Sequence, residues 1–167
     1  QQQRFGYEAA SVESELIRRL KSPIYGLHGL RAMYAASGPN AELSRAQFRA
    51  HVQSRDLAVE FPGVRGFGFI ANVPRAELDA FAAKERADAA PDFAVRTSGT
   101  APDLFIIKHI EPLANNRPAW GFDVGQEAVR RAAAERAVAT GQNTLTGKIT
   151  LVQDGKKTPG FLAFVPV

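Results

Sequence analysis

The side chains best suited to chemistry are three histidines and a few carboxylates set in apolar sequence; the 167-residue chain contains no cysteine. The lack of cysteine excludes disulfides, zinc–thiolate sites, iron–sulfur clusters and cysteine nucleophiles. His109 and Glu111 stand two residues apart, so on a strand they share one face and could supply two metal ligands. No third ligand is near them, and we interpret the pair as the polar face of a strand. No histidine has catalytic spacing to a serine or an acid, so no catalytic residue, metal site or cofactor is expected.

A second acid, Asp123, lies among apolar neighbours, between Trp120, Phe122 and Val124. A carboxylate in such surroundings needs either a structural partner or a ligand. Aspartate is a favoured N-cap residue, and a helix is predicted directly after this position. On spacing alone, the cap and the ligand-binding group both remain open for Asp123.

Composition places the chain among single globular domains, with 45% apolar and 23% charged residues. The net charge is 21 − 17 = +4, but basic residues occur as pairs interleaved with acids rather than as one stripe. We interpret them as solvated surface charge and expect no nucleic-acid partner. No stretch approaches the ~20 apolar residues of a membrane span. The apolar last eight residues, 160–167, predict a fragment of a longer polypeptide.

The elements that must position these residues begin with a helix over the first 36 residues. Pro23 interrupts its pattern, so one kinked helix and two consecutive helices are both compatible. The apolar stripe either packs on the core or pairs with a second copy of the chain. Steps of three and four define this stripe: Phe5, Ala9, Val12, Leu16, Leu20, Ile24, Leu27, Leu30 and Tyr34.

The remaining sequence predicts an α+β fold in which hairpin-connected strands form an antiparallel sheet flanked by helices. Ser44 and Gln47 fit a capping box, and Gly141 suits a helix C-terminus. Phe67 and Phe69 share one face of a glycine-spaced strand. Helices are predicted at 44–57, 75–88 and 126–140, and strands at 64–73, 92–97, 104–113, 144–153 and 160–165, the last two joined by a turn at 154–157.

From residue 61 onward the chain resembles CHASE domains, the extracytoplasmic sensor modules of cyclases and histidine kinases. Residues 27–37 also resemble the segment that precedes the domain. The matching pieces occur in the family's order: FPGVRGFG (61–68), IEP (110–112), Asn116 leading to GFD (121–123), EAVRRA (127–132), ATGQ (139–142), LTG (145–147), LVQ (151–153), GFL (160–162) and PV (166–167).

This resemblance implies a stalk helix at 1–38 and a membrane-distal, PAS-like ligand-binding subdomain at 39–167. In the plant cytokinin receptors of this family, an aspartate matching Asp123 holds the adenine edge. Leu145 matches a leucine that contacts the ligand, and Thr140 matches a threonine that we interpret as structural support. Around 108–117 the chain follows bacterial relatives rather than these receptors. Strand alternation adds candidates for an apolar lining: Phe67, Phe69, Phe105, Ile107 and Trp120.

The resemblance further implies the periplasmic sensor of a transmembrane receptor that binds a small molecule, with a cytokinin or adenine as one hypothesis. The output would be a cytoplasmic histidine kinase or diguanylate cyclase, and the membrane helices would lie outside this sequence. We expect a homodimer through the stalk. The alternative is a periplasmic protein-interaction or dimerisation domain whose pocket is filled by its own side chains.

Overall fold

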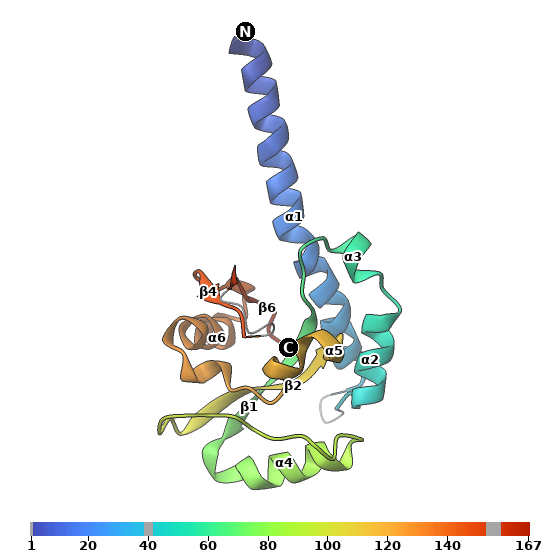
Figure 1. Ribbon diagram of the computed structural model, residues 1–167, viewed down its shortest axis with the longest axis vertical. Coiled ribbons are helices and arrows are strands. Elements are labelled where there is room, and N and C mark those ends of the chain that lie inside the picture. Colours follow the sequence, from blue (N-terminus) through green and yellow to red (C-terminus); the bar gives the residue numbers. More distant parts are fainter. Residues whose placement is uncertain (1, 39–41, 153–157) are drawn as a thin grey trace.

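The computed structural model describes residues 2–38, 42–152 and 158–167. A single helix, α1 (Gln2–Ala36), projects its N-terminal half away from a body of helices and short strands (Figure 1). Pro23 lies inside this helix, so of the two arrangements compatible with the sequence the single helix is formed and two consecutive helices are not. The side chain of Phe5 and the predicted turn at 154–157 lie outside the described part of the chain.

The central ladder joins β1 (Phe67–Pro74) and β2 (Asp103–Glu111), which pair antiparallel with a register shift after Phe69. Two isolated β-bridges extend the pairing beyond β2. One joins Ile106 of β2 to Asp123, and the other joins Phe122 to Arg96. The predicted strand at 92–97 therefore contributes one bridge rather than a full strand. The antiparallel α+β architecture is confirmed.

Two local sequence signals act as expected. Ser44 and Gln47 form a complete capping box at the start of α2, which ends earlier than predicted. Gly141 ends α6 in the left-handed conformation with φ 63°. The helices after α1 are α2 (Arg45–Gln53), α3 (Leu57–Glu60), α4 (Leu78–Ala87), α5 (Leu113–Asn116) and α6 (Ala128–Thr140), with 3₁₀ turns η1 (Arg75–Glu77), η2 (Arg117–Ala119) and η3 (Val124–Gln126).

The C-terminal strands are shorter than predicted. Glycine and proline interrupt the two stretches, and neither residue supports a long regular ladder. The pairing consists of two-residue ladders: β3 (Thr144–Leu145) with β6 (Ala163–Phe164), and β4 (Ile149–Thr150) with β5 (Pro159–Gly160).

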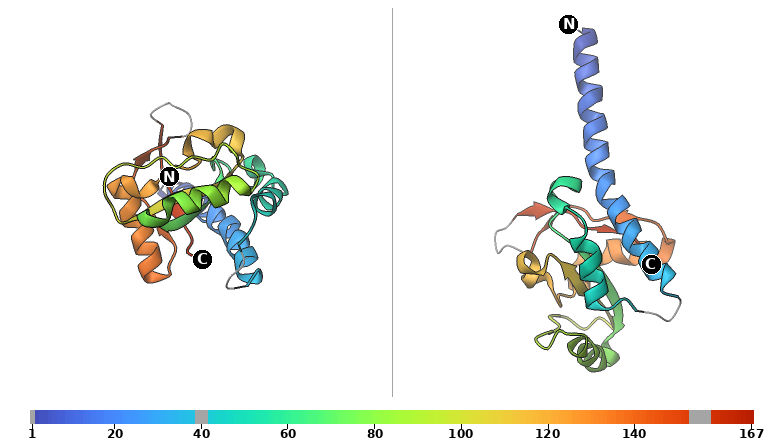
Figure 2. Two further views of the ribbon diagram at one scale, coloured as in Figure 1. Left: turned by 90° about the horizontal axis from the view of Figure 1, so that it is seen from below. Right: turned by 90° about the vertical axis from the view of Figure 1, so that its right-hand side faces the viewer.

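Two apolar clusters hold the body together. The larger one is built around β2 and packs against α4, which covers the end of the body opposite the projecting half of α1 (Figure 2). The smaller one joins the C-terminal half of α1 to α2 and β1 through Leu30, Phe48 and Phe67. Because one face of α1 enters this cluster, the helix is fixed to the body at its C-terminal half.

A substitution at Gly121 tests the packing between β2 and residues 94–96. Gly121 has φ 76°, and a Cβ there would overlap the carbonyl oxygen of Ala94. We expect Gly121→Ala to lower the free energy of unfolding by about 3 kcal/mol, from strain and overlap combined. Urea denaturation measures this loss. Gly6→Ala, which meets open space on α1, is the control and should leave stability unchanged or slightly raised.

Candidate functional site

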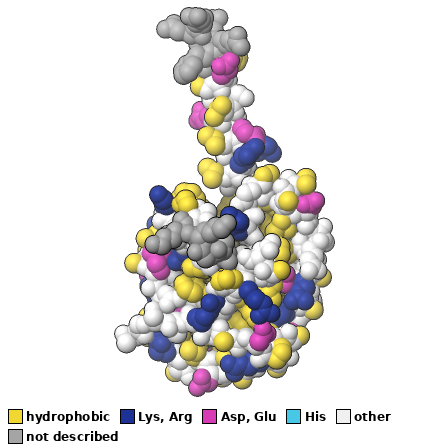
Figure 3. All heavy atoms as spheres, viewed as in Figure 1, with side chains coloured by type: hydrophobic (Ala, Val, Ile, Leu, Met, Phe, Trp, Pro, Cys, Tyr) yellow, Lys and Arg dark blue, Asp and Glu magenta, His cyan; other side chains and the backbone are white. Residues whose placement is uncertain are grey.

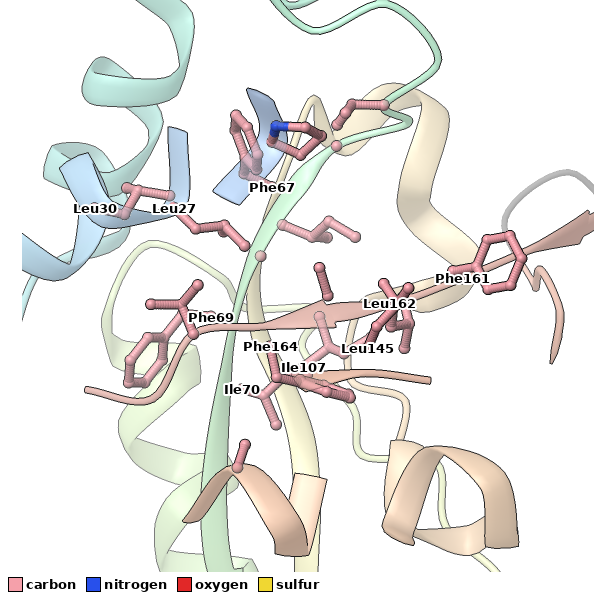
Figure 4. A pocket seen from close by; sticks show the side chains of 18 of the residues that line it. Leu27, Leu30, Phe67, Phe69, Ile70, Ile107, Leu145, Phe161, Leu162 and Phe164 are labelled. Carbon is pink, nitrogen blue, oxygen red and sulfur yellow. The ribbon is translucent and has the colours of Figure 1, made fainter. Parts of the chain in front are cut away.

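A cavity of about 1230 Å³ lies between α1, the β1–β2 ladder, α6 and the C-terminal segment. The C-terminal strand crosses over β1, carrying Leu162 and Phe164 above Ile70 and Ile107 (Figure 4). Leu27 and Leu30 of α1 form another wall. A space this large with mostly apolar walls has the character of a small-molecule pocket.

Five of the seven residues predicted to contact a ligand line this cavity: Phe67, Phe69, Phe105, Ile107 and Leu145. They come from β1, β2 and β3, so the fold brings together residues that are separated by up to 78 positions in sequence. Whether a ligand contacts them remains a prediction.

Trp120 lies elsewhere in the body. Its ring packs edge-on against Phe93, with centroids 5.3 Å apart, and its Nε1–H donates to the carbonyl of Lys108. The guanidinium of Arg45 lies 5.1 Å from the ring centroid. These contacts satisfy both the apolar surface and the single donor of the indole, which accounts for its burial as packing.

Asp123 also lies outside the cavity lining, and its buried carboxylate is bonded within the protein. Oδ1 accepts from the amide of Phe105 at 3.0 Å and from the amide of Gly125 at 2.9 Å, and Oδ2 accepts from the hydroxyl of Thr97 at 2.8 Å. The carboxylate thus caps η3, whereas Glu127 caps α6. These bonds are the structural partners that a carboxylate in apolar surroundings requires.

Thr140 and Leu145 lie near the end of α6. The Thr140 hydroxyl donates to the carbonyl of Arg136 at 2.7 Å and accepts from the amide of Gln142 at 3.2 Å. These two bonds hold the last turn of α6 against the loop that leads to Leu145. The side chain of Leu145 is about half exposed at the edge of the cavity.

Sequence reasoning missed the contributions of α1 and α6 to the cavity. Leu27, Leu30 and Tyr34 form the α1 wall, and Ala134 and Ala137 form the α6 wall. The three-and-four spacing of α1 was visible in the sequence, but it cannot distinguish a cavity wall from an ordinary core contact.

A network of ion pairs centred on the buried Glu85 links α4 to β2 and to the start of α2. The Glu85 carboxylate, 1% exposed, bonds Arg45 at 3.0 Å and Lys108 at 3.1 Å. Lys108 also bonds Glu42 at 2.8 Å, and the hydrogen bonds from Lys108 and Lys84 lower the pKa of Glu42 to about 2. The network ties β2, α4 and the start of α2 together.

His109 and Glu111 do not form a polar strand face in contact with water, because α2 covers them. His109 is 1% exposed and packs beside Phe48, and Glu111 accepts from Arg49 at 2.9 Å. The sequence predicted a shared polar strand face and made no statement on its exposure, because α2 lies more than fifty residues away in sequence.

The ligand atoms of Glu85, Asp88 and His109 lie within 4.8 Å of one another, as in a metal site. Both carboxylates are already engaged, Glu85 by two cations and Asp88 by the amide of Arg45 at 2.7 Å. A divalent cation would also be repelled by the buried guanidinium and ammonium groups. The cluster is therefore better suited to ion pairing than to holding a metal.

His109 gives the protein a pH-dependent stability. Burial, together with the charges of Arg45 and Lys108, lowers the pKa of His109 to about 4. The unfolded chain binds this proton near pH 6.5 and the folded chain only near pH 4, so stability falls as the pH drops between these values. We expect a loss on the order of 2–3 kcal/mol from pH 7 to pH 4.5, measured by urea denaturation.

Other groups titrate in this range, including His51, whose pKa burial also lowers. The contribution of His109 is the difference between the wild-type slope and that of His109→Gln. Equal slopes in the two proteins would contradict the prediction.

Charges on the surface are mixed. Lysine and arginine side chains lie among acidic ones on the face shown in Figure 3, without a continuous basic stripe there. No helix among the described residues has the length and apolarity needed to cross a membrane. The absence of a nucleic-acid partner remains a prediction.

The long helix, the small antiparallel sheet and the flanking helices define an α+β domain that encloses an apolar cavity. The family model of the CHASE domain matches residues 41–167, which is most of the chain, and the chain belongs to this family. CHASE domains are extracytoplasmic sensor modules of signalling receptors and are not catalytic. A search of curated proteins finds no match.

Proposed function

We propose that this domain binds a small molecule with a largely apolar body in the cavity and passes the signal along α1. A PAS-like subdomain at 39–167 would hold the ligand, and the stalk at 1–38 would lead toward the membrane of a periplasmic receptor. The output would be a cytoplasmic histidine kinase or diguanylate cyclase. The single observation that carries the proposal is the double role of α1.

One helix both walls the cavity and extends beyond the body. Its C-terminal half contributes Leu27, Leu30 and Tyr34 to the wall, and the N-terminal half projects as the stalk. A ligand that binds more tightly when this helix is in one position raises the population of that position. The size of the population shift is limited by the difference in affinity between the two positions. The movement then reaches whatever the stalk contacts.

The geometry favours an apolar ligand over one held through Asp123. That carboxylate is bonded to two amides and a hydroxyl outside the lining. Recognition of an adenine by Asp123 would require breaking contacts that stabilise the fold. We therefore propose that shape and apolar contact in the cavity, rather than Asp123, supply most of the binding.

A thermal-shift screen of this domain tests the proposal, with purines, amino acids, aliphatic and aromatic acids and neutral apolar compounds. A ligand at one hundred times its dissociation constant stabilises the fold by about 2.7 kcal/mol, which corresponds to a shift of about 5–10 °C at this chain length. Leu145→Trp, at the cavity edge, should reduce the shift. Val59→Trp, exposed and outside the lining, is the matched control. A shift that survives Leu145→Trp unchanged would place the ligand elsewhere.

The alternative function, an interaction or dimerisation domain, is favoured by the exposed half of α1. The stripe that packs on the body continues outward as apolar side chains with high exposure. Val12 is 60%, Leu16 56% and Leu20 64% exposed. Such a stripe on a helix suits a helix–helix seam with a second copy.

Val12→Asp tests this seam without touching the cavity lining. We expect the wild-type domain to self-associate through the stalk, and Val12→Asp to weaken self-association at least tenfold, because a charge in an apolar seam loses its hydration. Sedimentation equilibrium measures both constants. Ser14→Asp, on another face of the helix, is the control. A wild-type protein that stays monomeric at every concentration would rule out the seam.

A further inference from the structure

The cavity carries charge of one sign. Among the described lining residues the charged ones are Arg19, Arg31 and Arg65, and no acidic side chain lines the cavity with them. Arg19 is bonded to Glu15 at 2.7 Å, and Arg65 makes an interaction of its own. An anionic ligand group would therefore bind to whichever of these arginines has no partner within the described part of the protein.

Arg31 is that arginine. Within the described chain, it has no ion pair or side-chain hydrogen bond that would compete with a ligand. It lies four residues after Leu27 and three before Tyr34, so all three project from one side of α1. All three line the cavity.

Tyr34 adds an unused donor to the same turn. Its ring stacks on Phe69 with centroids 4.3 Å apart, and its hydroxyl is buried without a hydrogen-bond partner in the described structure. A buried hydroxyl without a partner is unfavourable, and an acceptor supplied by a ligand would relieve that cost. Burial, together with the charges of Glu42 and Glu85, raises the pKa of Tyr34, so the hydroxyl stays protonated and available as a donor.

We propose that the ligand is an amphipathic carboxylate, with its head group on Arg31 and Tyr34 and its apolar body inside the cavity. This inference rests on the proposed function and specifies the chemical class of its ligand. The planar guanidinium pairs with both oxygens of a carboxylate, and the charge-assisted bonds orient the molecule. The apolar body lies against the walls formed by Leu27, Ile70 and Phe164.

Calorimetric titration with decanoate, below its micelle-forming concentration, tests the inference. Two compounds with the same chain length are the comparisons: the neutral 1-decanol and the cationic decyltrimethylammonium ion. We expect decanoate to bind at least tenfold more tightly than decanol, and the cation to bind weakest. Decanol binding equal to decanoate, or tighter binding of the cation, would overturn the inference.

Two variants of α1 test whether Arg31 binds the carboxylate head group. Arg31→Gln should weaken decanoate binding about tenfold or more, the effect of losing hydrogen bonds to a charged group. It should leave decanol binding unchanged. Lys21→Gln removes the same charge from another face of α1, outside the lining, and should change decanoate binding less than twofold. Equal effects of the two variants would contradict a specific role of Arg31.

Tyr34→Phe separates binding from folding. The variant removes a hydroxyl that has no partner in the described structure, so stability should hold or rise, while decanoate binding weakens severalfold. Binding equal to wild type would remove Tyr34 from the site.

The inference and the proposed function can fail separately. One outcome is that decanoate does not bind but a neutral compound gives a thermal shift that Leu145→Trp reduces. In that case the inference of a carboxylate ligand is wrong, and the proposed binding of a small molecule in the cavity stands. If no compound of either charge class shifts the melting temperature, both fail.

Discussion

Replacing Glu85 with glutamine is expected to cost about 3 kcal/mol of stability, because it removes the charge at the centre of a buried ion-pair network. The Glu85 carboxylate bonds Arg45 at 3.0 Å and Lys108 at 3.1 Å, and all three side chains are buried. Burial raises the pKa of Glu85, while Lys108 and Arg45 favour its ionised form. Neutralising it leaves the buried Arg45 without its ion-pair partner and the buried Lys108 paired with Glu42 alone. Urea denaturation at pH 7 measures the loss.

The matched control is Glu135→Gln, which breaks an exposed ion pair with Arg131 at 3.1 Å. Exposed i,i+4 pairs contribute about 0.3–0.5 kcal/mol, so this variant should behave nearly as wild type. A double-mutant cycle that combines Glu85→Gln with Lys108→Met measures the interaction between Glu85 and Lys108. We expect a coupling free energy of about 1–3 kcal/mol. Equal losses for Glu85→Gln and Glu135→Gln would show that the network does not stabilise the fold.

Asp123→Ala is expected to lower the free energy of unfolding by about 3 kcal/mol through lost hydrogen bonds rather than lost ligand contacts. The substitution leaves the buried amides of Phe105 and Gly125 without an acceptor and removes the partner of the Thr97 hydroxyl. Each unsatisfied buried group costs about 1–3 kcal/mol. Thermal and urea unfolding of the ligand-free protein measure the effect.

Asp123→Asn is the informative comparison. Its side-chain oxygen can still accept from both amides, and its amide group can donate to the Thr97 oxygen, so the loss should be about 1 kcal/mol. If Asp123→Ala is as stable as wild type yet abolishes a purine-induced thermal shift, the carboxylate recognises a ligand and the structural account fails. If both variants bind the ligand of the wild type once folded, Asp123 is structural.

These two sites show why stability and binding need separate readouts in this protein. Both Glu85 and Asp123 are buried acids whose partners are protein groups, and neither lines the cavity. A variant that loses ligand response through unfolding would resemble one that lost a contact. Comparing each variant in the ligand-free state removes this ambiguity.

Local signals in the sequence were sufficient for much of the helical architecture and for the family. Capping at Ser44, the stop at Gly141 and the apolar periodicity of α1 act over a few residues, so neighbours along the chain determine them. The motifs from residue 61 onward likewise identify the CHASE domain, which the family match over 41–167 confirms. Strand lengths near the C-terminus were overestimated, because pairing depends on what lies opposite.

The site depended on tertiary structure. Arg45 and Glu85 are 40 residues apart in sequence, and Lys108 and Glu42 are 66 apart, so no local pattern reveals their ion pairs. The cavity likewise exists because the C-terminal segment and α1 meet over β1. Asp123 carries the same sequence signal whether it caps a turn or faces a ligand. Only the fold shows that this carboxylate caps η3, because hydrogen bonding of a buried carboxylate is set by which amides lie within about 3 Å of it.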